Sequence, residues 1–227
     1  MKFVLSYSGG KDSMLALYKM RQQGHEPVAL VATVDAAAQR SWFHGVPIWL
    51  LQAAADSLQI PLLLCASTPA DYTAALESSL RAARQLGATA AVFGDIDIAD
   101  HQAWNAERCQ NVGLECLLPL WQQPREQVVR ELLAAGFQAV IKIVDGQRLD
   151  PSFLGQTLTT ELLQKIQASG ADVCGEYGEY HTFVFAGPLF KQPLAFRAGP
   201  ALQLGTHWAI DLLPVDQPPE PGLLPAD

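Results

Sequence analysis

The stretch FVLSYSGGKDS, Phe3–Ser13, joins an apolar run to a glycine-rich turn and decides the fold of the first part of the chain. The run Phe3–Tyr7 predicts a buried strand, and the segment Ser13–Gln23, closed by Gly24, predicts a helix. Glycines between a strand and a helix let backbone N–H groups approach an anion, and the helix N-terminus adds partial positive charge. We therefore expect an anion-binding turn in a β-α unit.

The turn contains groups suited to phosphate, although it does not match the Walker A pattern GxxxxGK[ST]. Its serines supply hydroxyl donors, and Lys11 supplies a mobile cation. The carboxylate of Asp12 would repel phosphate, so we expect it to cap the helix or to hold a magnesium ion that bridges the phosphates. A glycine-rich turn that only caps a helix is the simpler alternative. The candidate phosphate-binding residues are Ser8, Gly9, Gly10, Lys11, Asp12 and Ser13.

Apolar strands and helices alternate over the first half of the chain. After the first unit the expected elements are a strand at Val28–Val34, a helix from Pro47, a strand at Leu62–Leu64, a helix over Asp71–Leu86, a strand at Thr89–Asp95 and a helix over Ala99–Asn111. Strands separated by helices of this size predict an α/β fold with a Rossmann-like parallel sheet and helices on both faces. In such sheets ligands bind beyond the carboxyl ends of the strands.

The pattern changes after about residue 120, which suggests three regions. We expect the parallel sheet to occupy residues 1–122 and a smaller α+β domain to occupy residues 123–213. The last region, residues 214–227, has five prolines in fourteen residues. Such a composition predicts an extended or disordered tail.

Polar residues also follow two later strands of the expected sheet. Asp35 ends the second strand, where backbone groups commonly meet adenine in related folds, although its carboxylate can simply face solvent. Gly94 and Asp95 end a later strand, where Asp95 is placed to contact a ribose, a metal or the substrate. His44 suits a donor to phosphate or substrate, and it equally suits a cap for the next helix.

Composition narrows the class of protein. The 227 residues include 15 Lys and Arg against 23 Asp and Glu, a net charge of −8, so we do not expect broad electrostatic binding to nucleic acid. No apolar run approaches the ~18 residues that span a bilayer, and no targeting signal precedes the first strand. Four cysteines without CxxC spacing indicate free thiols. We expect a cytoplasmic protein with no membrane association.

Two motifs carry a family resemblance. SGGKDS resembles the SxGxDS signature of the PP-loop ATP pyrophosphatases of the adenine nucleotide alpha hydrolase superfamily, which share a HUP-type sheet. GEYGEYHTFV (Gly175–Val184), followed by GPLF (Gly187–Phe190), resembles the hallmark of the diphthine–ammonia ligase family. Three shorter pieces agree in order: FHGVP (Phe43–Pro47), FGDI (Phe93–Ile96) and PLW (Pro119–Trp121). The resemblance runs from about residue 3 to about residue 190.

The second motif also offers catalytic groups. Glu176 and Glu179 flank Gly178, which lets the backbone bend so that both carboxylates can face one site. A carboxylate there can accept a proton from ammonium, orient the amine or hold magnesium. His181 suits a proton shuttle or a phosphate donor. Residues on a solvated turn would give the same pattern.

The resemblance implies an ATP- and Mg²⁺-dependent ligase that breaks the bond between the α- and β-phosphates. It implies that Lys11, Asp12, Glu176, Glu179 and His181 act on an adenylated carboxylate that ammonia converts to an amide. The acceptor in archaea and eukaryotes is diphthine on elongation factor 2. Bacterial relatives are expected to use another carboxylate, for example in corrinoid salvage. A tRNA-modifying PP-loop enzyme, a non-catalytic nucleotide-binding module and a homo-oligomer remain open.

Overall fold

The computed structural model describes residues 1–215 and contains two sheets. The larger sheet has the strand order β3-β2-β1-β5-β6, with β4 paired to β2. Its strands are β1 (Lys2–Ser6), β2 (Glu26–Asp35), β3 (Arg40–Ser41), β4 (Leu62–Ser67), β5 (Ala90–Val92) and β6 (Glu115–Leu117). All pairings are parallel except that of β3 with β2. The carboxyl ends of the parallel strands therefore share one edge.

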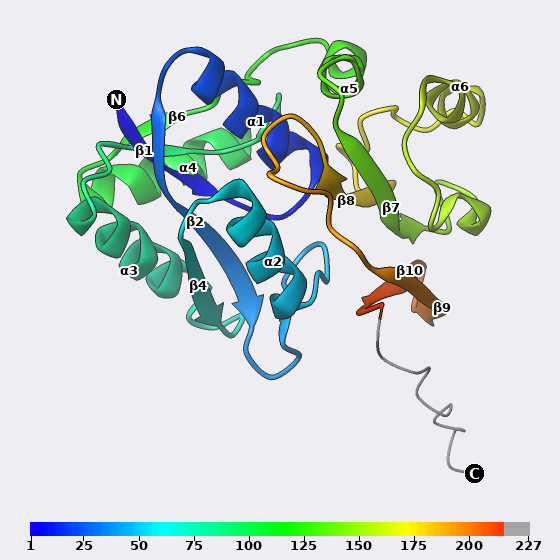
Figure 1. The fold of residues 1–227 in the computed structure, drawn as a ribbon, viewed down its shortest axis with the longest axis horizontal. Coiled ribbons are helices and arrows are strands. Elements are labelled where there is room, and N and C mark those ends of the chain that lie inside the picture. Colours follow the sequence, from blue (N-terminus) through cyan, green and yellow to red (C-terminus); the bar gives the residue numbers. More distant parts are fainter. Residues whose placement is uncertain (216–227) are drawn as a thin grey trace.

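Helices cover both faces of this sheet, with α3 and α4 on one side and α1 and α2 on the other (Figure 1). Their bounds are α1 (Lys11–Gln22), α2 (Ile48–Leu58), α3 (Tyr72–Gln85) and α4 (Ala99–Val112). The strand period of two explains the division. Val4 packs in the core of the α3 and α4 face, whereas Phe3 and Leu5 pack in the core of the opposite face. The expected α/β fold is confirmed.

Two element boundaries differ from the sequence-based expectation at the anion-binding turn. Helix α1 begins at Lys11 instead of Ser13, so Lys11, Asp12 and Ser13 form its first turn. Strand β5 ends at Val92, because the chain turns so that Gly94 lies against this helical turn. A Cβ on Gly94 would lie 2.8 Å from the backbone carbon of Asp12, which explains the glycine.

The second sheet is antiparallel, with the order β8-β7-β10-β9. Its elements are α5 (Arg125–Ala134), β7 (Gln138–Asp145), the short 3-10 helix η1 (Pro151–Phe153), α6 (Thr160–Ala168), β8 (Tyr180–Ala186), β9 (Arg197–Leu204) and β10 (His207–Leu213). Its buried residues continue the core of α1 and α2, since Phe183 and Ile141 belong to the same cluster as Leu5. The division at residues 122 and 123 stays a prediction. Of the expected tail, residues 216–227 lie outside the described residues.

Strand β8 joins the second sheet to the glycine-rich turn. The amide of Val184 donates to the carbonyl of Gly9 at 2.8 Å, and the amide of Lys11 donates to Thr182 Oγ1 at 3.1 Å. Helices α1 and α5 are also linked, by an ion pair of 2.7 Å between Lys19 and Glu131. The second sheet thus closes over the carboxyl edge of the first. None of the helices within residues 1–215 is long and apolar enough to cross a membrane.

Candidate functional site

A cavity of about 770 Å³ lies where the two sheets meet, a size typical of ligand sites. One end is polar and is lined by the turn after β1 and by the loop before β8. The other end is aromatic and is lined by the loop after β3 and by helices α3 and α4. The polar end holds Ser8, Lys11, Asp12, Ser13 and Glu176, and the aromatic end holds Trp42, Phe43, Tyr72 and Trp104.

The first turn of α1 presents backbone donors to the polar end. The first amides of a helix have no partner within the helix. That of Lys11 is taken by Thr182, while those of Asp12 and Ser13 have no acceptor within residues 1–215. Gly9 has a φ of +81°, and Gly10 leaves room for His44, whose Cε1 would lie 2.3 Å from a Cβ there. Free amides at a helix N-terminus suit an anion, and the binding of phosphate by this turn stays a prediction.

Lys11 and Asp12 form a close ion pair in this turn. Lys11 Nζ lies 2.7 Å from Asp12 Oδ2, and Lys11 is only 5% exposed. Burial lowers the pKa of Lys11, but the electrostatic interaction with Asp12, together with those with Cys174, Tyr180 and Glu176, outweighs it, and the net pKa lies well above the usual value. Lys11 is therefore a fixed cation at the polar end.

Glu176 lies in the loop before β8 and reaches the same polar end of the cavity as Lys11 and Asp12. One ligand atom each of Asp12, Cys174 and Glu176 lies within 4.8 Å of the others. Burial, and then the charge of Asp12, raises the pKa of Glu176 to about 7. Carboxylate oxygens suit Mg²⁺, whereas burial raises the pKa of the Cys174 thiol and keeps this soft donor protonated. The carboxylates fit a magnesium ion, and the thiol does not.

Glu179 does not share this position, although the sequence suggests two carboxylates on one site. It is 5% exposed and does not line the cavity. Its Oε2 accepts a hydrogen bond from the amide of Tyr177 at 3.0 Å, while its carbonyl accepts from the amide of Asp145. The turn at Gly178, with a φ of +82°, directs the two glutamates apart. A catalytic role for Glu179 stays a prediction.

Two histidines stand beside Lys11 on the cavity wall. The ring centroids of His44 and His181 lie 4.8 Å apart. His44 Nδ1 donates to the carbonyl of Thr182 at 2.9 Å, so its Nε2 carries the lone pair. Burial, which outweighs the hydrogen bond to Thr182, lowers the pKa of His44 to about 4. Burial and then the neighbouring His44 lower the pKa of His181 to about 3. Both rings are neutral near pH 7.

The two strand-end aspartates differ in position. Asp95 lines the cavity, and its carboxylate contacts His101 Nδ1 at 3.1 Å and Asn105 Nδ2 at 2.8 Å. Burial raises its pKa. Asp35 lies outside the cavity lining, and its Oδ1 accepts hydrogen bonds from the amides of Ala37 and Ala38. The structure brings Asp95, but not Asp35, to the site.

The aromatic end was not expected as a unit. Phe43 and Tyr72 have ring centroids 6.3 Å apart, and those of Tyr72 and Trp104 are 6.0 Å apart. Tyr72 begins α3, directly beyond the carboxyl end of β4. That position was the available signal for Tyr72. The sequence gives no signal for Thr182, because its contacts with Lys11 and His44 join segments that are far apart in the chain.

A parallel sheet with an anion-binding turn at its carboxyl edge defines an α/β protein of the nucleotide-binding class. Two family models then match this chain: the diphthamide synthase N-terminal domain over residues 1–116 and the diphthamide synthase C-terminal domain over residues 124–210. The chain belongs to the diphthamide synthase family. The family resemblance read from SGGKDS and GEYGEYHTFV is confirmed.

Curated relatives agree with this assignment. A diphthine–ammonia ligase of Mus musculus is 29% identical, covering 89% of this chain and 85% of that protein. The Homo sapiens protein of the same name is 27% identical, covering 86% and 82%. The protein of that name from Schizosaccharomyces pombe is 28% identical and is covered to only 35% of its length. A solved structure titled as a predicted subunit of a tRNA methyltransferase from Methanocaldococcus jannaschii has a TM-score of 0.44 and 14% identity, and covers 86% of this chain and 100% of that one.

Proposed function

We propose that this chain is an ATP-dependent ligase that joins ammonia to a carboxylate, forming an amide, AMP and pyrophosphate. The observation that carries the proposal is the polar end of the cavity. There the cation and free amides of the α1 turn face the carboxylate of Glu176, which comes from the loop before β8. Relatives at similar length are named diphthine–ammonia ligase.

In the first step an oxygen of the substrate carboxylate attacks the α-phosphorus of ATP. The bond to the bridging oxygen breaks, and pyrophosphate leaves with the electron pair. Lys11 and the amides of Asp12 and Ser13 stabilise the charge that develops on pyrophosphate. Asp12 would hold Mg²⁺, which neutralises phosphate charge and commonly takes one or two carboxylates with phosphate and water oxygens.

In the second step ammonia attacks the acyl carbon, and AMP leaves. Ammonia arrives as ammonium and must lose a proton, for which Glu176 is the acceptor. A pKa of about 7 is suited to general base catalysis near neutral pH. The neutral ring of His181 can donate to a phosphate or carboxylate oxygen beside it, while His44, whose Nδ1 already donates to Thr182, presents the lone pair of Nε2.

The aromatic end fits the base of the nucleotide. ATP is polar at one end and flat and aromatic at the other, as is the cavity. Phe43, Tyr72 and Trp104 offer stacking surface there. The base would then lie among these side chains, since no residue of the β2 end around Asp35 lines the cavity.

Purified protein with MgATP, ammonium and a candidate carboxylate tests the proposal by release of AMP and pyrophosphate. Diphthine is the first acceptor to try, because it is in the relatives' names. A small-molecule carboxylate is the second. Asp12→Asn removes the carboxylate that would hold Mg²⁺ and serves as the negative control, from which little AMP release is expected. Tight ATP binding without AMP from any carboxylate would favour a non-catalytic nucleotide-binding module.

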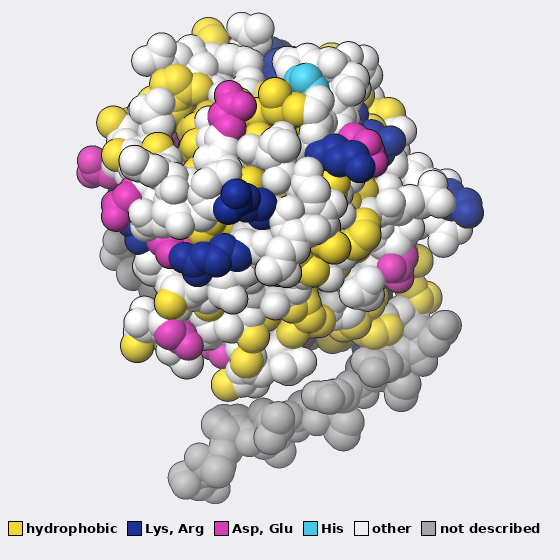
Figure 2. All heavy atoms as spheres, turned by 90° about the vertical axis from the view of Figure 1, so that its left-hand side faces the viewer, with side chains coloured by type: hydrophobic (Ala, Val, Ile, Leu, Met, Phe, Trp, Pro, Cys, Tyr) yellow, Lys and Arg dark blue, Asp and Glu magenta, His cyan; other side chains and the backbone are white. Residues whose placement is uncertain are grey.

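Salt-sensitive tRNA binding would instead revive a tRNA-modifying enzyme. The side of the molecule that bears α3 and α4 carries basic and acidic side chains interspersed with apolar ones (Figure 2). Such a face lacks the single-sign stripe that phosphate backbones select. This face therefore does not favour electrostatic binding of tRNA.

A further inference from the structure

A short segment, residues 40–47, forms one rim of the cavity, and we call it the rim loop. It runs from β3 to the start of α2 and carries Trp42, Phe43 and His44 into the cavity lining. Its ends meet through a bridge between Arg40 and Pro47. Within it the amide of Val46 donates to Ser41 Oγ at 3.0 Å. The rim loop is therefore closed on itself, and it is joined to the first sheet through the pairing of β3 with β2 and through Trp42, whose Nε1 donates to Ser67 Oγ at 2.9 Å.

The second sheet holds the rim loop at two points. Arg40 donates through Nη1 and Nη2 to the two carboxylate oxygens of Asp211 on β10, each at 2.7 Å. His44 donates to the carbonyl of Thr182 on β8. A bidentate arginine–carboxylate pair fixes orientation as well as distance. Neither Arg40 nor Asp211 lines the cavity, so any effect on the ligand passes through the rim loop.

A buried lysine shares this junction. Lys142 on β7 is 3% exposed, and its Nζ lies 3.3 Å from where a Cβ on Gly45 would stand. Its charge interacts with those of Arg40 and Asp211. Asp211 is thus one carboxylate shared by two cations. Its removal leaves both cations uncompensated beneath the rim loop, whereas removal of Arg40 leaves a carboxylate with Lys142 beside it.

We propose that Arg40 and Asp211 are a positioning pair. The pair sets the position of the rim loop, and with it Trp42, Phe43 and His44, at the edge of the cavity. The kinetic part rests on the proposed ATP-dependent ligase function. The structural part does not, because the Arg40–Asp211 pair, which we call the latch, joins two segments of the protein itself. The pair couples the closure of one sheet on the other to the shape of the site.

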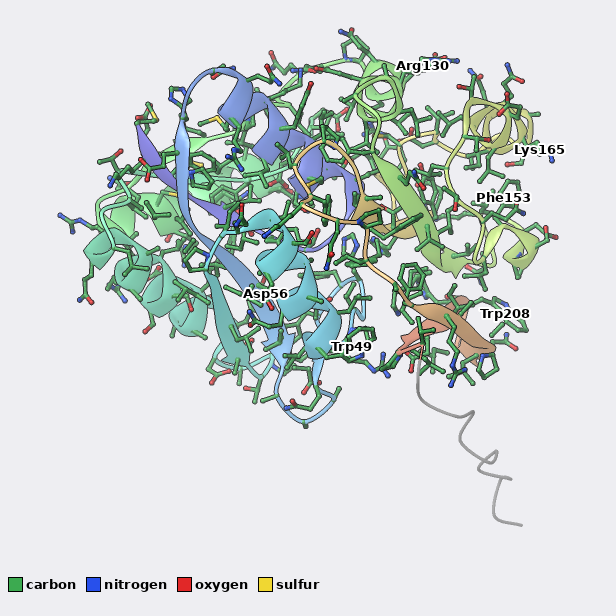
Figure 3. All side chains as sticks on the ribbon, in the orientation of Figure 1. Trp49, Asp56, Arg130, Phe153, Lys165 and Trp208 are labelled. Atoms are coloured by element: carbon green, nitrogen blue, oxygen red, sulfur yellow. The ribbon has the colours of Figure 1, made fainter. Side chains whose placement is uncertain are left out.

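Hydrogen exchange of the protein alone tests the latch. Asp211→Asn is expected to speed amide exchange within residues 40–47 about tenfold while α5 exchanges as in the wild type. Arg40→Lys keeps a charge but loses the bidentate geometry, so a smaller increase is expected. Glu126→Gln breaks the exposed Glu126–Arg130 pair on α5, distant from β10 (Figure 3), and serves as the control. Unchanged exchange in residues 40–47 for both latch variants overturns the proposal.

Kinetics then tests the positioning role. Asp211→Asn is expected to raise the KM for ATP about tenfold and to change kcat less than about threefold, with Arg40→Lys between it and the wild type. A fall in kcat alone would show that the pair does not position the residues that bind ATP. Faster amide exchange in the rim loop with an unchanged KM for ATP would show the same. If the wild type makes no AMP with any carboxylate, the proposed function fails. The exchange experiment still decides the latch in that case.

Discussion

The two loops that form the polar end of the cavity are built differently. The turn Ser8–Ser13 is set largely by its own residues: a strand, two glycines and the first turn of a helix place its donors, and β8 adds one hydrogen bond to Gly9 and accepts one from Lys11. The loop Gly175–His181 takes its shape from distant contacts. The carbonyl of Glu179 accepts from the amide of Asp145 on β7, and the guanidinium of Arg125 on α5 lies 4.3 Å from the ring centroid of Tyr177. The residue order of the turn Ser8–Ser13 predicts where its backbone donors lie. The residue order of the loop Gly175–His181 does not determine which way its side chains point.

The largest expected effect tests the local loop. Lys11→Met is expected to lower AMP formation about 10²- to 10³-fold, because it removes the fixed cation that faces the departing pyrophosphate. Single-turnover assays of AMP release measure this loss. The melting temperature serves as control, since the buried Asp12 pair is also lost. An activity within about threefold of the wild type would contradict the assignment of the polar end.

The next effect contrasts the two glutamates of the second loop. Glu176→Gln is expected to slow amide formation about 10- to 100-fold, because Glu176 faces the cavity. Glu179→Gln keeps an oxygen for the Tyr177 amide, and we expect less than about threefold. Quantifying amide and AMP separately shows which step is affected. Equal losses for both variants would mean that Glu179 turns into the site.

A third test separates the glycines that shape the turn. Gly10→Ala brings its Cβ against the ring of His44, while Gly94→Ala brings its Cβ against the backbone of Asp12. Both are expected to lose about 1–3 kcal/mol in unfolding free energy. His44→Ala should remove most of the Gly10→Ala loss and none of the Gly94→Ala loss. Urea unfolding of the singles and doubles provides the comparison.

The smallest effect concerns stability and pH at the latch. Burial lowers the pKa of Lys142 to about 8, so between pH 8 and 10.5 the unfolded chain binds more protons there. Its unfavourable term is thus present below pH 8 and lost as pH rises to about 10.5. Lys142→Met is expected to stabilise the protein below pH 8 by at most about 3 kcal/mol. Unfolding curves of both proteins across this range should converge at high pH.

Residues of the same type show where sequence reasoning succeeds. Asp35 is the last residue of β2 and Asp95 follows the end of β5 by three residues, yet only Asp95 lines the cavity. Asp35 is used by the turn that follows it, through the amides of Ala37 and Ala38. Both sequences permit a turn, and nothing short of the folded path of residues 36–39 separates them. The sequence therefore predicts which residues at the carboxyl edge of the sheet are candidates for the site. It does not predict which of these candidates line the cavity.

The order of strands, helices and glycines by itself determined the α/β fold and the shape of the turn after β1, because hydrophobic period and backbone freedom act over a few residues. The motifs SGGKDS and GEYGEYHTFV carried the resemblance to the family. Tertiary structure alone decided that Thr182 caps α1, that Glu176 meets Asp12, and that Asp211 holds the rim loop. Thr182 and Asp211 each meet a partner 171 residues away in sequence. Their pairing depends on how two sheets pack, which no local pattern encodes.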